Sequence, residues 1–222
     1  MRAAIYSPYD KQQIIRELRQ NGFLISQSDP DFVFVYGGDG SILNAEHLFP
    51  GVPKVPVQKS LICSKCRHYD TRKLTDVVEA IKLHDFRLQK ETKVDLIVAG
   101  ERITALNEVQ VRNKDLRKSL RFSVSYERKK KELIGDGVVV ATPFGSTAYY
   151  RSMGYEPFKS GIRIGFNNVW PKASAIKTER CSVKILREEA VVAADNFFTG
   201  VLRGGDTIAI RKSREKARFV IA

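Results

Sequence analysis

The sequence feature that most constrains the fold is an apolar run followed at once by a cluster of glycines. Phe32–Tyr36 is apolar throughout, without the alternation of a strand that has one wet face. Such a run is typical of a strand covered on both faces, as in the middle of a parallel sheet. Gly37-Gly38-Asp39-Gly40 ends it, and we expect Ser41 to cap a helix that runs through His47. A buried strand, a glycine turn and a helix in this order predict parallel α/β structure.

The rest of the first part of the chain alternates between strand and helix in the same way. Apolar spacing predicts helices over Lys11–Gln20 and Thr71–His84, and short apolar runs predict strands over Ala3–Tyr6 and Val52–Val57. We therefore expect an α/β domain with a parallel sheet over residues 1–90.

Beyond residue 90 the apolar period changes from helical to two, which predicts strands with one wet face. Only Ser146–Met153 has a helical pattern in this half. We expect a β-rich C-terminal domain over residues 91–222, with the alternative that its final strands pack back on the first domain. The predicted strands are Val94–Ala99, Ile103–Val111, Leu120–Tyr126, Gly137–Ala141, Ile162–Phe166, Ser182–Leu186, Ala190–Ala194 and Thr207–Ile210.

The chain of 222 residues has a surplus of positive charge, 38 − 25 = +13. This surplus predicts an anionic partner without identifying it, since nucleotides, polyphosphate, nucleic acid and acidic lipids all remain open. The local basic run Arg128–Lys131 lies between two strand-like segments, and we expect a solvated hairpin turn there.

Neither a membrane span nor a metal centre is indicated. No apolar run approaches the ~18–20 residues that cross a bilayer, and the polar start lacks a secretory signal, so we expect a cytoplasmic protein. Cys63 and Cys66 form a lone C-x-x-C, whereas a structural zinc usually has about four ligands. We assign no metal ligands and interpret both cysteines as ordinary loop residues.

The glycine loop Gly37–Gly40 has the chemistry of a phosphate site. Glycines let a ligand approach the backbone, and the free N–H groups at the start of the next helix attract anions. Asp39 is then placed to take a proton from an attacking hydroxyl or to help hold a divalent metal. A tight turn in which Asp39 bonds its own backbone explains the same residues structurally.

Two further segments carry polar residues that the apolar pattern does not require. Asn107 lies on the apolar face of the predicted strand Ile103–Val111, where its amide needs a partner from protein or ligand. Farther along, Asp136 precedes an apolar strand, and Ser146 and Thr147 stand at the start of the predicted helix. These two hydroxyls either cap that helix or bind a ribose or phosphate oxygen.

Taken together, the three segments resemble the NAD kinase family. The resemblance consists of the G-G-D-G loop at Gly37–Gly40, the pair Asn107-Glu108, and Asp136–Tyr149, which follows the signature D-G-x-x-x-x-T-P-x-G-S-T-A-Y. It extends loosely from Ala3 to about Val220, and the third segment is its most specific part.

The resemblance implies a kinase with an α/β nucleotide-binding domain and a β-rich substrate-binding domain. Such an enzyme transfers the γ-phosphoryl group of ATP, or of polyphosphate, to the 2′-hydroxyl of the adenosine ribose of NAD, giving NADP. It implies Mg²⁺ or Mn²⁺ with ATP, NAD as substrate, and a homodimer or homotetramer. It implies no specific nucleic-acid partner and no membrane partner.

The resemblance also implies roles for individual residues. Asp39 would be the base that faces the 2′-hydroxyl, Asn107 and Glu108 would hold the adenosine half of NAD, and Asp136 would approach the nicotinamide side. The residues implied in nucleotide or substrate binding are Gly37, Gly38, Gly40, Asn107, Glu108, Asp136, Thr142, Ser146, Thr147, Ala148, Tyr149, Ser152 and Asp195.

Three segments depart from the family pattern. Pro56–Cys63 stands where a G-x-N-x-G-like stretch is expected, Gly154–Pro157 replaces a G-G-P, and Asp195-Asn196 replaces an Asp-Gly pair. A large residue in place of glycine takes up volume near a ligand. A kinase of another small hydroxylated metabolite and a non-catalytic nucleotide-binding protein therefore stay open as alternatives. A basic nucleic-acid-binding module is a further alternative, although the chain lacks the interleaved aromatic and basic residues of a single-strand platform.

Overall fold

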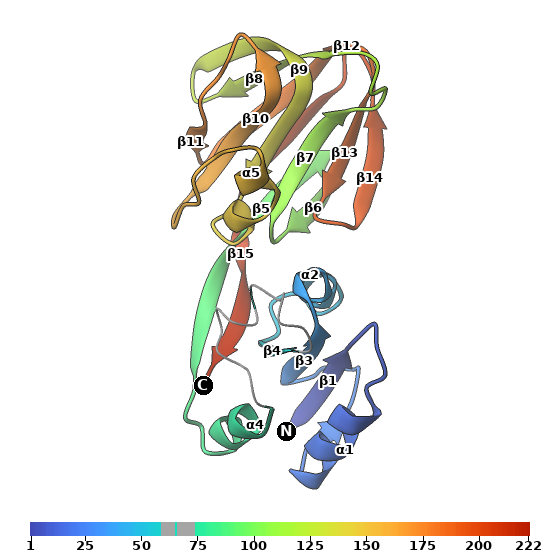
Figure 1. Cartoon of the computed structure of the whole chain (residues 1–222), viewed down its shortest axis with the longest axis vertical. Helices are drawn as coiled ribbons and strands as arrows, with labels where there is room; N and C mark the ends of the chain where they lie inside the picture. The colour runs from blue at the N-terminus through green and yellow to red at the C-terminus, as the bar shows by residue number, and fades with distance from the viewer. Residues whose placement is uncertain (59–64, 66–73) are drawn as a thin grey trace. The chain divides into compact units, whose positions relative to one another are not determined.

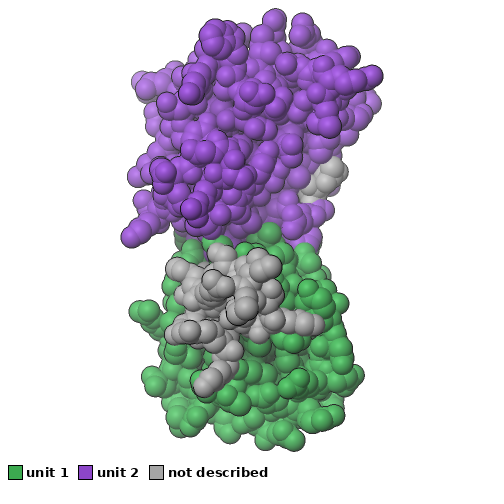
Figure 2. All heavy atoms as spheres, viewed as in Figure 1, with its two compact units in different colours: residues 1–91, 216–222 green, residues 92–215 purple. Residues whose placement is uncertain are grey.

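The computed structural model describes residues 1–58, 65 and 74–222, and two compact units divide the chain. Unit 1 is formed by Met1–Glu91 with Lys216–Ala222, and unit 2 by Thr92–Glu215 (Figure 2). The sequence predicts a boundary at residue 90, with the final strands as a possible addition to the first domain. Cys63, Cys66, the last part of Pro56–Cys63 and the predicted helix start at Thr71 lie outside the described residues.

Unit 1 is built on parallel strands (Figure 1). The end of β15 pairs with β4, β4 with β3, β3 with β1, and β1 with β2, all in parallel. Its elements are β1 (Arg2–Tyr6), α1 (Gln12–Gln20), β2 (Leu24–Ile25), β3 (Phe32–Gly37), α2 (Asp39–Leu48), β4 (Lys54–Gln58), α4 (Leu74–Lys82) and the end of β15 (Thr207–Ile221).

The central strand of unit 1 behaves as its apolar run predicts. Four consecutive side chains of β3, Phe32–Val35, are buried, because apolar groups cover both faces. Phe34 packs in the same apolar cluster as Leu18 of α1 and Ile81 of α4. Burial of this cluster supplies the main driving force for docking the helices on the sheet.

Helix α2 begins at Asp39, and Gly38 is its N-cap residue. The prediction that Ser41 caps this helix is therefore wrong. The Ser41 side chain is buried and packs against Gly37, where an added Cβ would collide with the Ser41 hydroxyl. The N–H groups of Ser41 and Ile42 donate to the Gly38 carbonyl at 2.9 and 3.3 Å, so the helical hydrogen bonds start at the glycine loop itself.

Unit 2 is an antiparallel β structure. Its main path is β14-β13-β7-β9-β8-β12-β15, while β10 pairs with β9 and β11, and β5 pairs with β15 and β6. Its elements are β5 (Arg87–Val98), β6 (Glu101–Ala105), β7 (Glu108–Asn113), β8 (Leu120–Tyr126), β9 (Lys129–Ala141), η1 (Gly145–Thr147), α5 (Tyr149–Ser152), β10 (Ile162–Trp170), β11 (Ile176–Thr178), β12 (Arg180–Arg187), β13 (Ala190–Ala194), β14 (Phe198–Leu202) and β15.

Several elements of unit 2 differ in length from their sequence patterns. The predicted strand Thr207–Ile210 continues to Ile221, and the strand β14 has no counterpart among the predictions. The predicted helix Ser146–Met153 is split into a 3₁₀ turn and a four-residue α-helix, with Ala148 between them at φ −98° and ψ −124°. Arg128–Lys131 is exposed at the β8–β9 hairpin, as predicted. The fold class predicted from the sequence is confirmed.

No helix in the described part of the chain is both long and apolar enough to cross a bilayer.

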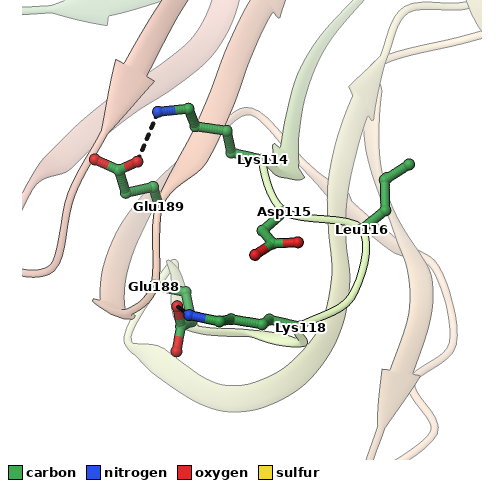
Figure 3. A pocket seen from close by; sticks show the side chains of 6 residues that line it. All are labelled: Lys114, Asp115, Leu116, Lys118, Glu188 and Glu189. Carbon is green, nitrogen blue, oxygen red and sulfur yellow. Dashed lines mark hydrogen bonds and ion pairs between the residues drawn. The ribbon is translucent and has the colours of Figure 1, made fainter.

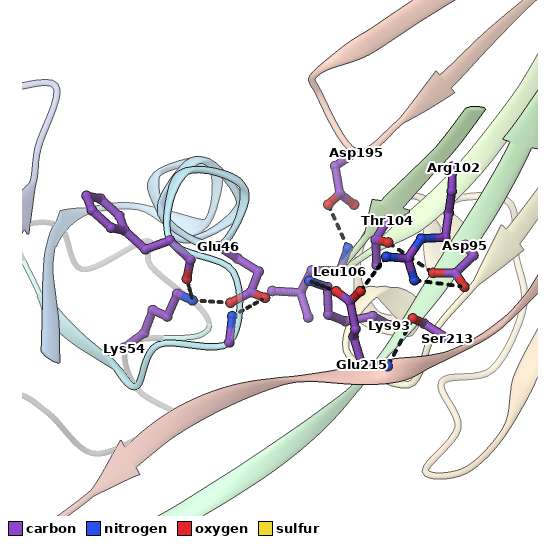
Figure 4. Close-up of polar contacts among 12 residues, drawn as sticks. Glu46, Lys54, Lys93, Asp95, Arg102, Thr104, Leu106, Asp195, Ser213 and Glu215 are labelled. Carbon is purple, nitrogen blue, oxygen red and sulfur yellow. Dashed lines mark hydrogen bonds and ion pairs between the residues drawn. The ribbon is translucent and has the colours of Figure 1, made fainter. Parts of the chain in front are cut away.

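A buried ion pair ties helix α2 to strand β4. Lys54 is fully buried and Glu46 is 3% exposed, and the Lys54 ammonium contacts both the Glu46 carboxylate and the Phe49 carbonyl (Figure 4). The N–H of Gly51 donates to the second Glu46 oxygen at 3.2 Å. Because both charges are desolvated, their mutual contact offsets part of the cost of burying them.

We predict that Lys54→Met destabilises the chain by about 3–5 kcal/mol, because it removes the ammonium group that contacts the buried Glu46 carboxylate. The double variant Glu46→Gln/Lys54→Met should recover much of this loss, since neither charge is then buried. Urea unfolding at neutral pH measures both. Lys130→Met, which removes the cation of the exposed Lys130–Glu132 pair, is the control and should change stability by at most about 1 kcal/mol. An equally small effect of Lys54→Met would contradict this account.

Candidate functional site

The residues singled out by sequence fall in both units. In unit 1, Asp39 is the first residue of α2, and its side chain is exposed. Its Oδ1 accepts a hydrogen bond from the N–H of Lys65 at 3.0 Å. Burial lowers the pKa of the Lys65 ammonium, while the carboxylates of Asp39 and Glu91 oppose that shift. The carboxylate thus lies at the positive end of a helix, with a lysine nearby.

The glycines of this loop divide into two kinds. Gly37 is required by packing, because its Cβ would collide with Ser41. A Cβ at Gly38 or Gly40 would meet no heavy atom of the described residues within 4 Å. Packing within the described chain therefore does not explain these two glycines, whereas close approach of a ligand to the backbone does.

In unit 2, Asn107 and Glu108 lie where one strand ends and the next begins. Strand β6 ends at Ala105 and β7 begins at Glu108, so the predicted continuous strand Ile103–Val111 is wrong at its centre. Leu106 is fully buried in this break, Glu108 is buried and Asn107 is half-buried. Asn107 is therefore a loop residue rather than a member of an apolar strand face.

The backbone of this break is held by hydrogen bonds from two distant residues. The Asp195 carboxylate accepts a hydrogen bond from the N–H of Leu106 at 2.7 Å (Figure 4). It also accepts from the N–H groups of Asn107 at 2.7 Å and Glu108 at 3.3 Å. The Thr142 hydroxyl donates to the Leu106 carbonyl at 2.6 Å, and the Thr142 N–H donates to the Asn107 carbonyl at 2.9 Å. The structure thus brings Asn107, Glu108, Thr142 and Asp195 together.

Two side-chain oxygens of this group have no hydrogen-bond partner among the described residues. They are Asn107 Oδ1 and Glu108 Oε2, and both atoms are buried. Glu108 Oε1 accepts from the Gln110 amide at 3.0 Å, so one half of this carboxylate is held and the other half is available. Since buried polar atoms are nearly always paired, two unpaired oxygens on adjacent residues indicate a ligand.

Burial is also the main cause of an altered titration at Glu108. Burial raises the pKa of its carboxyl to about 7, the hydrogen bond from Gln110 lowers it, and the charge of Asp195 raises it. A carboxyl group that is held half-ionised near neutral pH is typical of functional sites. Gln110 was not predicted, although its position two residues from Glu108 on the same strand face is a signal that could have found it.

The third motif segment packs directly on the break. Gly145 has no room for a side chain, because its Cβ would collide with the backbone of Asn107. The buried Ser146 hydroxyl donates to the Pro143 carbonyl at 2.7 Å and accepts from the Phe158 N–H at 3.3 Å, so its hydrogen bonds are used within the protein. Thr147 and Ala148 are exposed.

Tyr149 is half-buried between side chains of neighbouring strands. The Arg112 guanidinium lies 5.3 Å from the centroid of its ring, and its hydroxyl accepts from the Asn167 amide at 3.2 Å. The exposed Ser152 hydroxyl donates to the Tyr149 carbonyl at 2.8 Å. Arg112 and Asn167 were missed by sequence reasoning, because both reach Tyr149 through cross-strand pairing with Gly137.

Asp136 lies between two glycines that the sheet requires. A Cβ at Gly135 would collide with the backbone at Asn168, and one at Gly137, which has φ +136°, would collide with the backbone at Val111. The Asp136 carboxylate accepts from the Asn168 amide at 3.1 Å and is half-buried.

The departure at Gly154–Pro157 has a packing explanation. The Tyr155 ring stacks on the fully buried Tyr150 at a centroid distance of 5.0 Å. Its hydroxyl donates to the Phe166 carbonyl at 3.0 Å and accepts from the Phe166 N–H at 2.9 Å. Gly165 makes room, since a Cβ there would lie 3.0 Å from each of the two tyrosine rings. The large side chain of Tyr155 thus packs within an aromatic cluster of unit 2.

Hollows elsewhere on unit 2 contain none of these residues. One, of about 530 Å³, is crossed by the ion pairs Lys114–Glu189 and Lys118–Glu188 (Figure 3). Another, of about 430 Å³, is lined by residues that include Cys181 and Arg211. Among the described residues, no three His, Cys, Asp or Glu side chains group together as metal ligands.

The chain is similar to known proteins both in sequence and in fold. The chain is 28% identical over 224 residues to an NAD kinase of Methanothermobacter thermautotrophicus. The aligned region covers 92% of this chain and 76% of that protein. Its fold matches an NAD kinase from Archaeoglobus fulgidus in complex with ATP, with a TM-score of 0.78, 21% identity, and 99% and 93% of the two chains covered. It also matches yeast NADH kinase complexed with NADH, with a TM-score of 0.82, 15% identity, and 100% and 83% covered.

No protein-family model matches the chain. The resemblance to NAD kinases that the three motifs indicate is nevertheless confirmed in sequence over most of the chain. At these identities the solved structures establish the fold, which is that of NAD kinases and NADH kinase. The chain is a divergent relative of these proteins.

We predict that Glu108→Gln stabilises the chain at pH 8 and has little effect at pH 5. Because the folded-state pKa of Glu108 is raised from 4.5 to about 7, the folded state binds the proton more tightly than the unfolded state. Stability is therefore lost as the pH rises from about 4.5 to about 7. The full difference corresponds to about 3 kcal/mol at pH 8, and to less than about 1 kcal/mol at pH 5.

Urea unfolding of both proteins at the two pH values measures this difference. Glu132→Gln is the matched control, because Lys130 holds the pKa of that exposed carboxyl below its usual value. This variant should not stabilise the chain at pH 8. Equal stability of Glu108→Gln and the wild-type chain at pH 8 would contradict the assignment of a buried, ionisable Glu108.

Proposed function

We propose that the chain is an NAD kinase, which transfers the γ-phosphoryl group of ATP to the 2′-hydroxyl of the adenosine ribose of NAD and so forms NADP. The observation that carries this proposal is the pair of buried, unpartnered oxygens of Asn107 and Glu108, in a chain whose sequence is similar to an NAD kinase over most of its length. Polyphosphate is a second possible donor of the same phosphoryl group.

Unit 2 supplies groups that match the adenosine half of NAD. An amide oxygen such as Asn107 Oδ1 accepts from an exocyclic amine, as in adenine, and a carboxylate oxygen such as Glu108 Oε2 accepts from ribose hydroxyls. The half-buried Tyr149 ring and the exposed Thr147 and Ala148 offer a surface for the base, and Asp136 is assigned to the nicotinamide side. Gly145, Ser146 and Thr142 support this surface through the hydrogen bonds and close contacts given above.

Unit 1 supplies the proton acceptor and the phosphate site. The exposed Asp39 carboxylate takes the proton of the 2′-hydroxyl as the oxygen bonds to the γ-phosphorus, and the bond from that phosphorus to the β-phosphate oxygen breaks. The N–H groups at the start of α2, reached past Gly38 and Gly40, bind phosphate oxygens. Lys65 adds positive charge near Asp39.

Magnesium, or manganese, is proposed to enter with ATP, because the triphosphate binds it and its charge offsets that of the phosphates. The exposed carboxylate of Asp39 is an oxygen ligand of the kind that magnesium prefers. A homo-oligomer and a cytoplasmic location remain predictions from the sequence.

We predict that the purified chain forms NADP from ATP, NAD and Mg²⁺, and that Asp39→Asn lowers kcat by at least about a hundredfold, because an amide does not accept the proton. An enzymatic assay specific for NADP measures both. Since Asp39 is exposed, circular dichroism and the thermal unfolding midpoint should be unchanged in this variant.

Asp76→Asn is the matched control, because Asp76 is likewise an acidic residue in the first turn of a helix of unit 1. This variant should keep wild-type turnover. Wild-type turnover of Asp39→Asn would refute its role as the base. A screen of hydroxylated acceptors with labelled ATP that yields a product other than NADP would favour the alternative, a kinase of another metabolite.

A further inference from the structure

The Asp195 carboxylate is buried in unit 2 and accepts three backbone hydrogen bonds there. The residue is 7% exposed, and it is separated by 87 to 89 positions in sequence from the three N–H groups that it accepts. Its Oδ2 accepts from Leu106, and its Oδ1 accepts from both Asn107 and Glu108. Each carboxylate oxygen of Asp195 therefore accepts at least one backbone hydrogen bond within unit 2.

The same residue also closes the loop through its backbone. The Asp195 N–H donates to the Glu108 carbonyl at 3.0 Å, directly after the last strand pair between β13 and β7, Ala194↔Val109. Asp195 has φ +50°, a left-handed conformation that aspartate tolerates better than most residues. This turn brings the carboxylate back over the break between β6 and β7.

A buried carboxylate is costly unless several donors bind it. Burial raises the pKa of Asp195, while its three backbone hydrogen bonds and the Lys93 charge lower it. Without the Asp195 carboxylate, the N–H groups of Leu106, Asn107 and Glu108 would lose the acceptor that they share. The carboxylate and the break therefore satisfy one another.

Thr142 and Gly145 restrict the same three residues from the other side. Thr142 bonds the carbonyls of Leu106 and Asn107, and Gly145 lies against the Asn107 backbone. The backbone of Leu106–Glu108 is thus fixed at its N–H and its carbonyl groups. Its two side-chain oxygens, Asn107 Oδ1 and Glu108 Oε2, are left for a ligand.

We propose that Asp195 is a positioning residue for NAD rather than a residue that touches it, and that it acts by holding the backbone of Leu106–Glu108 so that the free oxygens of Asn107 and Glu108 stay aimed at the nucleotide. This inference rests on the proposed function for the identity of the ligand. It replaces the direct substrate contact that the family resemblance implies for Asp195.

A graded series of variants tests the proposal. In Asp195→Asn one oxygen still accepts from Asn107 and Glu108, but an amide N–H faces the N–H of Leu106. In Asp195→Ala both acceptor oxygens, and with them all three hydrogen bonds, are lost. We expect the KM for NAD to rise by about tenfold in Asp195→Asn and further in Asp195→Ala, because hydrogen bonds to a charged acceptor are lost from the loop. The KM for ATP should stay within about twofold, since the phosphate loop is in unit 1.

Hydrogen–deuterium exchange of the unliganded protein supplies the second readout. Exchange of the amides of Leu106, Asn107 and Glu108 should quicken in the same order, because these N–H groups lose their acceptor. Asp95→Asn is the matched control, because Asp95 is a buried carboxylate of unit 2 that accepts hydrogen bonds from Thr104 (Figure 4) and from Arg211. It should lower stability without raising the KM for NAD.

The outcomes of these experiments test the positioning role of Asp195 separately from the proposed NAD kinase activity. An unchanged KM for NAD in Asp195→Asn would overturn it. A raised KM with unchanged exchange at Leu106–Glu108 would also overturn it, because Asp195 would then contact the ligand directly. If the wild-type chain formed no NADP, the proposed function would fail, and unchanged exchange in both variants would still refute the positioning role. If Asp195→Ala did not fold, Asp195→Asn would carry the same test, because its amide oxygen keeps an acceptor for the N–H groups of Asn107 and Glu108.

Discussion

The candidate site of unit 2 depends on one requirement, that the backbone of a strand break inside a β core must find hydrogen-bond partners. Between β6 and β7 the chain leaves the sheet at Leu106 and Asn107, and water cannot serve the groups that are buried there. Asp195 accepts the N–H groups and Thr142 serves the carbonyls. Because the backbone is satisfied by these two residues, the side chains of Asn107 and Glu108 do not have to satisfy it, and they remain available.

The arrangement lowers the stability of the folded chain mainly through the burial of Glu108. Its burial raises the pKa of the carboxyl to about 7, so the folded state carries a group that would be easier to ionise in the unfolded chain. If this residue had only a structural role, a neutral side chain in place of Glu108 would make the folded chain more stable. A ligand with hydroxyl donors reverses the balance, since it supplies hydrogen bonds to the ionised form. The same burial that destabilises the free protein therefore strengthens each hydrogen bond that a nucleotide makes there.

Local patterns account for the parts of the fold that could be predicted. The buried strand Phe32–Tyr36, its glycine loop and the helix after it are adjacent in sequence, so their order alone indicates parallel α/β structure. The period of two beyond residue 90 indicates the β-rich part in the same way. The partners of Asn107 could not be read from the sequence, because Asp195 lies 88 positions away and is brought in by the pairing of β13 with β7. The full length of β15 is likewise set by its neighbours β12, β5 and β4 rather than by its own sequence.

Glycines show most clearly where sequence reasoning stops. Gly37, Gly135, Gly137 and Gly145 are required because another chain segment occupies the space of a Cβ, whereas Gly38 and Gly40 have open space there. A sequence does not separate these cases, although only the second kind points to a ligand. Tyr155 is the opposite case, a large residue at a position where the family pattern has glycine. The sequence alone suggests that it takes up ligand space, but its ring stacks on Tyr150, and Gly165 leaves room for it. The side chain of Tyr155 is therefore accommodated within the aromatic cluster. The strand break that carries Asn107 and Glu108 is held separately, by its hydrogen bonds to Asp195 and Thr142.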